Sequence, residues 1–503
     1  MTANEFYASL SGKRITFVGV GRSNLPLIEQ FKAHGAAVSV RDKRSEAALG
    51  EDGEALKKLG AKLICGEDYL ESIDEDMLFR APGVPYLLPE LQKARANGVA
   101  VTSEMEVFFD LCPCKIYAVT GSDGKTTTTS VIAEMLKAAG KTVHLGGNIG
   151  RPLLPEIRDV KPEDVAVVEL SSFQLISMRR SPNVAVITNL SPNHLDVHKD
   201  MDEYVNAKKN VLLHQNAFGR TVLNADNALT AACAADTRGM TYMFSRREKT
   251  NGAWCSADGK IYFGDEYIME ESDIRIPGKH NVENYLAAIS AVWGDVSKEV
   301  IRTVAKEFNG VEHRMEFVRE LDGVRWYNDS IATSPSRAMI GTLSLYDFKI
   351  VMIAGGADKK VPFDELGKVI CDKVKTLVLL APEKPLEGFK TPAAGKIEAA
   401  VRGAVDERAE EHQQARHDNE RREQREENGF DEAQRHIGAE LELHEEHGDQ
   451  TADGRERAGA DLGDGLAQRH NDRLAQGQGA VLLLEAVAED DGVVDGECQL
   501  QDA

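Results

Sequence analysis

The sequence predicts an α/β protein with mainly parallel sheets, and three observations lead to this fold class. Short β-branched runs alternate with amphipathic helical segments in three stretches of the first 402 residues, as in strand–helix–strand units. Two of these units carry a glycine-rich turn between strand and helix, at residues 19–21 and 121–124. The surplus of acidic residues is confined to the chain after residue 402, so the remainder has the composition of a globular protein.

Length and composition favour a soluble protein with two to four domains. The chain has 503 residues, of which 42% are hydrophobic, so it can build substantial cores. No apolar run approaches the roughly 18 residues of a membrane span, and the first residues, MTANEFYASLSGKR, lack the apolar core of a signal peptide. Of seven scattered cysteines only Cys112 and Cys114 lie close in sequence, without further ligands at zinc-site spacing. We therefore expect a cytoplasmic protein with reduced thiols and no membrane insertion.

The net charge of −22 belongs mainly to the C-terminal segment. Residues 403–503 contain 10 Arg and no Lys against 28 acidic residues, a net charge of −18. The preceding residues are left near −4 and show no footprint of nucleic-acid binding. The segment also lacks Pro, Ser, Trp, Tyr and Met, and only VLLLEAVA (481–488) has the apolar content to pack. We interpret it as disordered or translated out of frame, with a genuine acidic appendage as the alternative.

The first predicted unit spans residues 13–42. KRITFVGVG forms a strand ending in glycines, NLPLIEQFKAHG an amphipathic helix, and AAVSVRD a second strand. Gly19 and Gly21 supply two of the three glycines of a dinucleotide fingerprint, and Asp42 stands where its ribose-binding acid is expected. Because the third glycine is missing, two interpretations stay open: nucleotide binding, or a tight turn alone.

The second unit carries a phosphate-binding loop that is shorter than the common one. KIYAVT predicts a strand, GSDG a loop, and KTTTTSVIAEMLKAAG a helix, but Val119 stands where G-x-x-x-x-G-K-[ST] requires glycine. Gly121 and Gly124 allow backbone amides to face phosphate oxygens at a helix N-terminus. Lys125 adds a positive charge, and the Thr126 hydroxyl is a ligand type that Mg²⁺ accepts. The pattern predicts ATP binding.

Two further strands end in polar segments that we expect at the same edge of the sheet. Residues 164–170 end at Glu169, and residues 183–190 lead to His194 and His198. Ligands of open parallel sheets bind beyond the carboxyl ends of the strands. Glu169 is interpreted either as a Mg²⁺ ligand or as a helix cap. The two histidines suggest zinc by spacing, but a third ligand is lacking, so Mg²⁺ fits better.

Later motifs offer more polar candidates. Asn281 and Asn284 lie at the start of an Ala-rich helix, where capping is the simpler interpretation. Arg314 is suited to binding a phosphate or a carboxylate. Asp329 ends a predicted strand of a third α/β unit, and Lys359 follows the glycine turn after another.

Ten ordered motifs, covering about the first 400 residues, resemble the Mur ligases. They are VGVGRSN, TGSDGKTTTT, GGNIG, VELSSFQL, NHLDVH, AKKN, PGKHNVEN, EHRMEF, NDSIATSP and AGGADK. The shortened phosphate loop is a feature that this family shares with folylpolyglutamate synthases. The resemblance implies a Rossmann-like UDP-binding domain (1–110), a central ATP-binding ligase domain (111–315) and a C-terminal Rossmann-like amino-acid-binding domain (316–402), apparently incomplete, before the acidic tail (403–503).

The resemblance is greatest to the members that add D-glutamate to UDP-N-acetylmuramoyl-L-alanine in peptidoglycan precursor synthesis. It implies that ATP phosphorylates the alanyl carboxylate and that the amine of D-glutamate attacks the resulting acyl phosphate. The products are an amide, ADP and phosphate. The implied cofactors are ATP, Mg²⁺ at two sites and a carbamylated lysine, in a monomeric enzyme.

The family's functional residues are carried over motif by motif. The implied catalytic residues are Lys125, Lys208 and His194. The implied ATP-binding residues are Gly121, Ser122, Asp123, Gly124, Lys125, Thr126, Thr127, Asn281, Asn284, Arg314 and Asp329. The implied substrate-binding residues are Ser23, Asn24, Asp42, Asn148, Ser330, Thr333 and Lys359. The implied metal ligands are Thr126, Glu169, His194 and Lys208 as a carbamate, with Lys209 as the alternative to Lys208 if the register is off by one.

The sequence departs from the family pattern in two places. Ile331 stands where a number of relatives have lysine, and the Ser-Pro-Ala-x-Ala-Ser-Phe-Asp-type segment that grips the D-glutamate carboxylates is absent. Two alternatives to the D-glutamate ligase therefore stay open. One is a catalytically impaired binder of UDP-sugar and ATP, and the other is a different Mur-type or folylpolyglutamate-type ligase.

Overall fold

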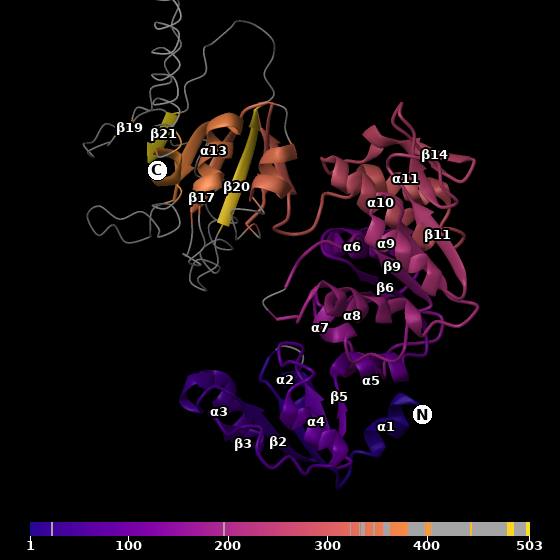
Figure 1. Ribbon diagram of the computed structural model, residues 1–503, viewed down its shortest axis with the longest axis vertical. Coiled ribbons are helices and arrows are strands. Elements are labelled where there is room, and N and C mark those ends of the chain that lie inside the picture. Colours follow the sequence, from indigo (N-terminus) through magenta and orange to yellow (C-terminus); the bar gives the residue numbers. More distant parts are fainter. Residues whose placement is uncertain are drawn as a thin grey trace, which may run out of the picture. The chain divides into compact units, whose positions relative to one another are not determined.

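The structure is a computed structural model, and it divides into two compact units, Met1–Phe308 and Asn309–Ala503 (Figure 1). The units are described separately. The residues described are 1–21, 24–194, 197–321, 323–330, 332, 338–345, 348–355, 363–380, 397, 399–402, 404, 443–444, 480–486 and 499–502. Among them no helix is long and apolar enough to cross a membrane.

The first unit begins with a five-stranded parallel sheet in the order β3-β2-β1-β4-β5. Its strands are β1 (Arg14–Val18), β2 (Ala37–Asp42), β3 (Lys62–Cys65), β4 (Met77–Arg80) and β5 (Ala100–Thr102). The helices that accompany it are α1 (Ala3–Ala8), α2 (Leu25–Ala33), η1 (Ala47–Leu49), α3 (Gly50–Lys58), α4 (Pro89–Ala96) and α5 (Glu104–Leu111). β1 and β2 end side by side, so the glycine turn after β1 meets the end of β2.

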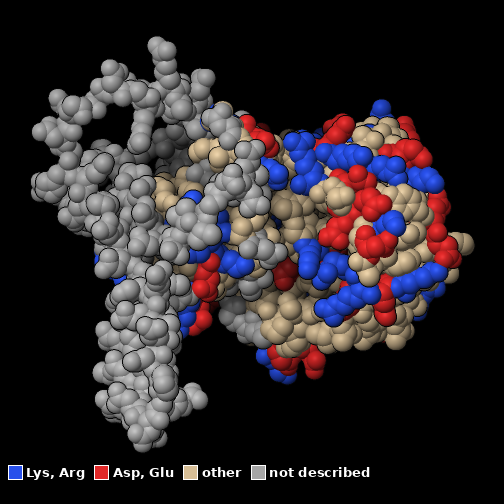
Figure 2. Space-filling view, turned by 90° about the horizontal axis from the view of Figure 1, so that it is seen from above, with Lys and Arg blue, Asp and Glu red and all other residues tan. Residues whose placement is uncertain are grey.

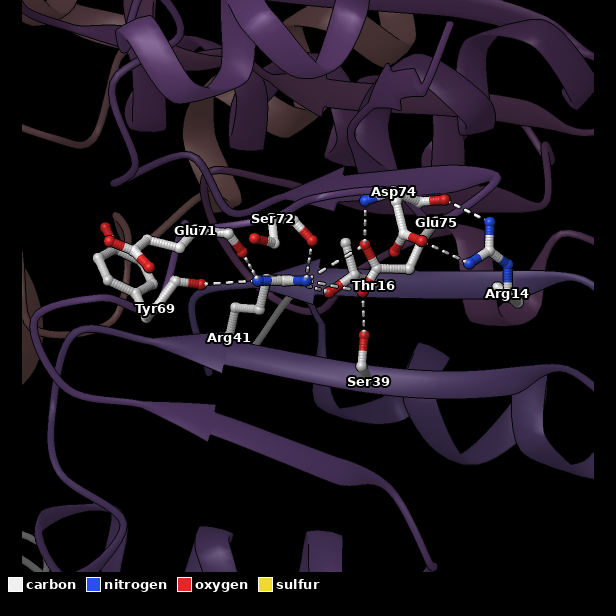
Figure 3. A network of polar contacts seen from close by, with 9 residues as sticks. All are labelled: Arg14, Thr16, Ser39, Arg41, Tyr69, Glu71, Ser72, Asp74 and Glu75. Carbon is white, nitrogen blue, oxygen red and sulfur yellow. Dashed lines mark hydrogen bonds and ion pairs between the residues drawn. The ribbon is translucent and has the colours of Figure 1, made fainter. Parts of the chain in front are cut away.

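A buried arginine organises the loop between β3 and β4 (Figure 3). Arg41 of β2 is 3% exposed and donates to the carbonyl oxygens of Tyr69 and Glu71, at 3.1 and 2.8 Å. It also pairs with Glu75 at 3.0 Å, and Glu75 accepts a hydrogen bond from Ser39 at 2.8 Å. Burial raises the pKa of Glu75, but the hydrogen bonds from Ser39 and Arg41 outweigh it and lower that pKa. The buried guanidinium of Arg41 thus has both an ionic partner and hydrogen-bond acceptors, which offset the cost of removing a charge from water.

A second parallel sheet of six strands follows, in the order β11-β10-β9-β6-β8-β7. Its strands are β6 (Lys115–Thr120), β7 (Val143–Gly147), β8 (Val165–Glu169), β9 (Val184–Ile187), β10 (Arg220–Asn224) and β11 (Met240–Phe244). An antiparallel sheet adds β12 (Ala253–Cys255), β13 (Lys260–Phe263) and β14 (Glu266–Glu270). The helices are α6 (Lys125–Ala138), η2 (Leu154–Glu156), α7 (Ser172–Leu175), α8 (Met201–Leu213), α9 (Ala228–Ala232), η3 (Cys233–Asp236), η4 (Glu271–Asp273), α10 (Lys279–Val292) and α11 (Lys298–Glu307).

The central strands of this sheet are apolar on both faces, because helices cover each face. On β6, Ile116 and Ala118 face the core that includes α5 and α8, whereas Tyr117 and Val119 face the core that includes α6 and α10. β8 and β9 alternate between the same two cores. This pattern is typical of parallel strands in α/β proteins.

The two parallel sheets of the first unit share a hydrophobic core and are joined by buried polar contacts. The core cluster contains residues of both sheets, among them Phe17 and Ile116. Arg80, at the end of β4, donates to the carbonyl oxygens of Val84 at 2.7 Å and Phe173 at 2.8 Å. The predicted domain boundary at 110–111 lies at the end of α5, inside this shared core. The division into three domains stays a prediction.

The second unit is built on a sheet in the order β15-β16-β20-β17-β18-β21-β19. β15 (Glu316–Leu321) and β16 (Val324–Asn328) form a hairpin, and β17 (Ile350–Gly355) pairs in parallel with β18 (Val374–Leu379). Its helical segments are η5 (Ala338–Thr342), η6 (Leu343–Leu345) and α13 (Asp364–Lys373).

The acidic C-terminal segment contributes three strands to this sheet. They are β19 (Leu443–His444), β20 (Ala480–Ala486) and β21 (Gln499–Asp502). β20 lies between β16 and β17, antiparallel to both. It covers most of the VLLLEAVA run, the part of the tail that we predict can pack. Apart from these strands and residue 404, the tail lies outside the described residues.

The surface of the described residues carries both signs of charge. On the face shown in Figure 2, Lys and Arg side chains are interspersed with Asp and Glu. This mixture agrees with a net charge near −4 for the chain before residue 403.

Candidate functional site

The phosphate-loop candidate connects β6 to α6, and space alone requires glycine at both of its glycine positions. A Cβ atom on Gly121 would lie 1.9 Å from Oγ1 of Thr188, and one on Gly124 would lie 2.2 Å from Oδ1 of Asn284. Gly124 also has a φ of 76°, in the left-handed region that favours glycine. The loop is therefore packed tightly between the end of β9 and α10.

The two residues after β9 hold the loop in place. The amides of Ser122 and Asp123 donate to the backbone and side-chain oxygens of Asn189, both at 2.9 Å. The hydroxyl of Thr188 donates to the carbonyl oxygen of Asp123 at 2.6 Å. Because Asn189 engages the amides of Ser122 and Asp123, the amides suited to bind phosphate are those of the first turn of α6.

Neither Thr188 nor Asn189 is among the predicted ATP-binding residues, although the segment from Asn189 to His198 is predicted to lie at this edge of the sheet. The signal for them was the polar pair directly after an apolar strand, where a parallel sheet presents its ligand-binding edge.

Two predicted site residues, Thr126 and Asn148, contact a third, Glu169. Its carboxylate is buried at the end of β8, next to β6. One oxygen accepts a hydrogen bond from the Thr126 hydroxyl at 2.7 Å, and the other accepts one from the Asn148 side-chain amide at 2.6 Å. Asn148 is further fixed by its backbone amide, which donates to the carbonyl oxygen of Glu169 at 2.8 Å. The cluster presents hard oxygen atoms beside the start of α6.

Lys208 reaches the same loop from α8. Its side chain is 2% exposed, and its amine donates to the carbonyl oxygen of Gly121 at 2.8 Å and to the Thr120 hydroxyl at 3.3 Å. Burial, and then the positive charge of Lys125, hold the pKa of Lys208 well below its ordinary value, and nearby carboxylates oppose this only in part. Burial therefore makes the Lys208 amine easier to deprotonate than the amine of an exposed lysine.

Lys209 points elsewhere. Its ammonium forms an ion pair with Asp236, and 21% of its side chain is exposed. Of the two adjacent lysines, Lys208 is therefore the one that contacts the phosphate-loop backbone.

The Lys125 side chain folds back over its own loop. Its ammonium donates to the carbonyl oxygen of Ser122 at 2.9 Å. Lys125 is the first residue of α6, so its charge lies at the positive end of the helix dipole.

The two predicted histidines differ in their surroundings. His198 is buried, and its ring nitrogens lie 2.9 Å from the Ser172 hydroxyl and 3.3 Å from a Glu203 oxygen. It also stacks on Phe173, with ring centroids 5.2 Å apart. His194 meets the edge of the same ring at 5.1 Å and has a φ of 54°. Because both nitrogens of His198 are engaged, the pair is not arranged as a zinc site.

No group of three or more His, Cys, Asp or Glu suited to a metal ion occurs among the described residues. A magnesium site needs no such group. Mg²⁺ is usually held by one or two carboxylates together with phosphate oxygens and water. Thr126 and Glu169 supply ligands of that type.

Asn281 and Asn284 are buried at the start of α10, which packs against α6. The Asn281 side-chain amide donates to the carbonyl oxygen of Pro277 at 2.6 Å, but among the described residues no side chain caps the backbone amides at the start of α10, so the capping interpretation is wrong. Asn284 donates to Asn281 at 3.1 Å and accepts from the Thr128 hydroxyl at 3.2 Å. This chain of hydrogen bonds ties α10 to the helix that begins at the phosphate loop.

In the first sheet, Asp42 joins the end of β2 to the glycine turn after β1. Its carboxylate accepts the backbone amide of Val20 at 2.8 Å and pairs with Arg44 at 2.9 Å. Burial raises the pKa of Asp42, but the hydrogen bonds from Arg44 and the amides together lower it. Arg44 was not among the predicted site residues. Its position two places after Asp42 was the feature of the sequence that could have indicated this ion pair.

Asn24 is buried beside this turn. Its side-chain amide donates to the carbonyl oxygen of Gly19 at 2.8 Å, and its Oδ1 atom has no hydrogen-bond partner among the described residues. The predicted Ser23 lies outside the described residues.

The remaining predicted residues belong to the second unit. Asp329 is buried, accepts the backbone amide of Met315 at 3.2 Å and accepts a hydrogen bond from Thr342. Ser330 is also buried, next to Asp329. Arg314 lies two residues before β15, whereas Thr333 and Lys359 lie outside the described residues. That these residues act together with the phosphate loop stays a prediction.

Comparison with known proteins agrees with this arrangement. Residues 119–292 match the Mur ligase middle domain. A UDP-N-acetylmuramoylalanine–D-glutamate ligase of Acetivibrio thermocellus is 50% identical over 387 residues, which cover 76% of this chain and 83% of the relative. A ligase of the same name from Clostridium kluyveri is 47% identical over 383 residues, with the same two coverages. Among solved structures, a UDP-N-acetylmuramate-alanine ligase of Thermotoga maritima is 19% identical, with a TM-score of 0.48 over 78% of this chain and 88% of that one. With half of the aligned residues identical to the Acetivibrio relative over most of its length, the chain belongs to the Mur ligase family, in the group of the UDP-N-acetylmuramoylalanine–D-glutamate ligases.

Proposed function

We propose that this protein is an ATP-dependent ligase that joins D-glutamate to UDP-N-acetylmuramoyl-L-alanine through an acyl phosphate. The two relatives are named UDP-N-acetylmuramoylalanine–D-glutamate ligases, and this supports the proposed pair of substrates. The observation that carries the proposal is the convergence of Thr126, Glu169, Asn148 and Lys208 on one phosphate loop. We further propose that the enzyme acts as a monomer in the cytoplasm.

Activation of the substrate requires phosphoryl transfer, which depends on positioning and on charge stabilisation. The alanyl carboxylate oxygen attacks the γ-phosphorus of ATP, and ADP leaves. In this scheme the first-turn amides of α6 orient the phosphates, and Lys125 neutralises charge on the transferred group. Thr126 and Glu169 would hold Mg²⁺, which when bound supplies further positive charge at the phosphate oxygens.

The second step forms the amide bond. The amine of D-glutamate attacks the acyl carbon, phosphate leaves, and the ammonium proton is lost to solvent or a nearby base. A carboxylate is a poor electrophile, so phosphate as the leaving group is what ATP contributes. The chain's own task in this step is to hold the amine near the acyl carbon and to exclude water.

We propose that Lys208 reacts with carbon dioxide to form a carbamate. The neutral amine attacks the carbon, a nitrogen–carbon bond forms and one proton is lost, so the lysine becomes an anion. The lowered pKa of Lys208 supports this proposal, because only an unprotonated amine has the lone pair for that attack. The carbamate and His194 are the proposed ligands of a second Mg²⁺.

The other roles are proposed from family membership and from chemistry. Asn24, Asp42 and Ser23 are the proposed contacts of the uridine nucleotide, and the buried Oδ1 of Asn24 supports this as an acceptor that a ligand donor would satisfy. Asn148 is a proposed contact of the acyl substrate. The proposed contacts of ATP beyond the loop are Asn281, Asn284, Arg314 and Asp329. The proposed contacts of D-glutamate are Ser330, Thr333 and Lys359.

A release assay for ADP tests the proposal. We expect turnover with UDP-N-acetylmuramoyl-L-alanine that depends on D-glutamate, and none when glycine or L-alanine replaces it. Binding of UDP-sugar and ATP without turnover would instead favour an impaired binder, which the absent Ser-Pro-Ala-type segment makes the second candidate. Turnover with another amino acid would favour a different ligase of the family.

The phosphate-loop role has its own test. Lys125→Ala should lower ADP release by on the order of 100-fold or more, because the transferred phosphoryl group loses its cation. Binding of UDP-N-acetylmuramoyl-L-alanine, measured by calorimetry, should be unchanged. Lys137→Ala is the matched control, since Lys137 ends the same helix and pairs with Glu134 at the surface. Equal loss in both variants would contradict the role.

A further inference from the structure

Two cysteines lie together on the connection between the two parallel sheets of the first unit. Cys112 follows α5, Cys114 precedes β6, and their sulfur atoms are 3.5 Å apart. The proposed ligase chemistry uses neither thiol. β6 runs from this connection directly to the phosphate loop.

The local backbone brings the two thiols to the same side. Cys112 caps α5, with its amide donating to the carbonyl oxygen of Phe108 at 2.8 Å and with extended dihedral angles of −62° and 119°. Pro113 fixes the next φ near −65°, so residues 112 and 114 occupy alternate positions of an extended segment and share one face. Cys114 is buried in the shared core, whereas Cys112 is only half-buried at its rim.

The two thiols also differ in acidity. A hydrogen bond from Cys114 lowers the pKa of Cys112, because it stabilises the thiolate. The same hydrogen bond, then burial and the negative charge of Asp164, raise the pKa of Cys114. Cys112 is therefore the thiol that ionises first and meets solvent, and Cys114 is a protonated thiol behind it. In thiol–disulfide exchange an accessible thiolate attacks first and forms a mixed disulfide, and a neighbouring thiol then displaces the second partner. The two cysteines are arranged for this order.

We propose that Cys112 and Cys114 form a redox-active dithiol that low-molecular-weight disulfides, such as glutathione disulfide, oxidise to an intramolecular disulfide. The Cys112 thiolate attacks one sulfur of glutathione disulfide, a mixed disulfide forms, and glutathione thiolate leaves. Cys114 gives its proton to a released thiolate and attacks the Cys112 sulfur, which expels the second glutathione. Two protein thiols are oxidised and one small disulfide is reduced to two thiols, so atoms and electrons balance.

The reaction is easy to follow by mass spectrometry. Trypsin releases residues 96–115 as a peptide that holds Cys112 and Cys114 and no other cysteine, and residues 63–80 as one that holds only Cys65. The folded full-length protein is incubated with glutathione disulfide, then quenched with N-ethylmaleimide in denaturant, so that the buried Cys114 thiol also reacts if it is reduced, and digested. We expect the 96–115 peptide to lose two hydrogens and to escape alkylation, at oxidant levels that leave Cys65 alkylated.

Cys65 is the matched reference, because it is also half-buried while burial and Asp42 raise its pKa. Two conservative variants separate the roles. Cys114→Ser should accumulate glutathione on Cys112, and Cys112→Ser should keep Cys114 reduced. Thermal unfolding of each variant verifies that it is folded. In the unchanged protein, the alkylation rate of Cys112 is compared with that of Cys65, and we expect Cys112 to react faster.

Three results would overturn the proposal. One is a 96–115 peptide that stays doubly alkylated at oxidant levels that modify Cys65. Another is a folded Cys114→Ser protein that gains no glutathione on Cys112. The third is an alkylation rate of Cys112 that does not exceed that of Cys65. None of these measurements depends on ligase activity, so they stand apart from the test of the proposed function.

Discussion

At the scale of single residues, the position of one buried lysine decides the chemistry that we propose. Lys208 and Lys209 are neighbours with the same side chain, but α8 directs only Lys208 to the backbone of the phosphate loop. Lys209 pairs with Asp236. The low-dielectric position of Lys208, next to the cation of Lys125, favours its neutral form.

We predict that Lys208→Ala lowers ligase turnover by on the order of 100-fold or more, since the proposed carbamate and its metal contact are lost. A small carboxylate such as formate or acetate should restore part of the rate, because it can occupy the vacated space and supply the anion. ADP release with and without added carboxylate measures the effect. Lys209→Ala is the control and should keep nearly the full rate. A reversal of the two results would assign the role to Lys209.

Gly124 gives a second prediction at this scale. Gly124→Ala adds a Cβ that meets Asn284 at 2.2 Å and also strains a φ of 76°. We expect a loss of about 100-fold in kcat/KM for ATP, because a displacement of about 1 Å in such a loop is enough for that loss. Gly140→Ala is the control, as Gly140 has a φ of 81° but no atom near the added Cβ. It should cost only about 1–2 kcal/mol of stability and leave the rate unchanged.

At the scale of elements, α5, which connects the two parallel sheets of the first unit along the chain, is tied to the start of η2 through a buried carboxylate. Glu104 opens the helix and is 5% exposed. It accepts the backbone amides of Leu153 and Leu154 at 2.9 and 2.7 Å. Burial raises its pKa to about 7, although these amides oppose the shift. The folded protein thus holds a proton on Glu104 that the unfolded chain releases near pH 4.5.

We predict that Glu104→Gln removes a pH dependence of stability. Between about pH 4.5 and 7 the folded state binds more protons at this site, so the stability due to Glu104 falls as the pH rises. The shift corresponds to about 3 kcal/mol. At pH 8 the glutamine variant should therefore be more stable than the parent, and near pH 5 the two should be similar. Urea unfolding across this range measures the difference, with the exposed Glu134→Gln as control. Parallel curves for parent and Glu104→Gln would contradict the prediction.

At the scale of the whole molecule, the chain consists of two compact units with separate cores. The clusters around the first two sheets lie within residues 1–308, and the cluster around β17 and β18 lies within the second unit. We therefore expect a core substitution in one unit to lower the stability of that unit and to leave the stability of the other unchanged.

We predict that Leu377→Ala, in β18, destabilises the second unit by about 2–5 kcal/mol, because it opens a cavity in a fully buried site. Binding of UDP-N-acetylmuramoyl-L-alanine to the first unit should persist. Leu223→Ala, in β10, should lower the stability of the first unit instead. Denaturant unfolding followed by two probes, one in each unit, distinguishes these results. Equal shifts of both transitions in either variant would show that the units unfold as one.

Local order along the chain is what the sequence by itself determined. The strand, glycine loop and helix at residues 115–138 follow from short-range pattern, and the ten motifs identify the family. Local pattern left Lys209 as the alternative to Lys208, and it did not identify the contacts made by Arg44 and Arg80. It left Glu169 open between a metal ligand and a cap.

Only the tertiary structure shows the contacts that these residues make, because the contacts join segments far apart in sequence. β6 lies between β8 and β9 in the sheet, so Glu169 reaches Thr126 and Asn189 reaches Asp123, although residues 127–168 and 124–188 separate these partners. The rotation of α8 against this edge turns one lysine inward and its neighbour to Asp236. Sequence pattern reports which face of an element is apolar, but partners across a sheet follow from strand order, which no local pattern contains.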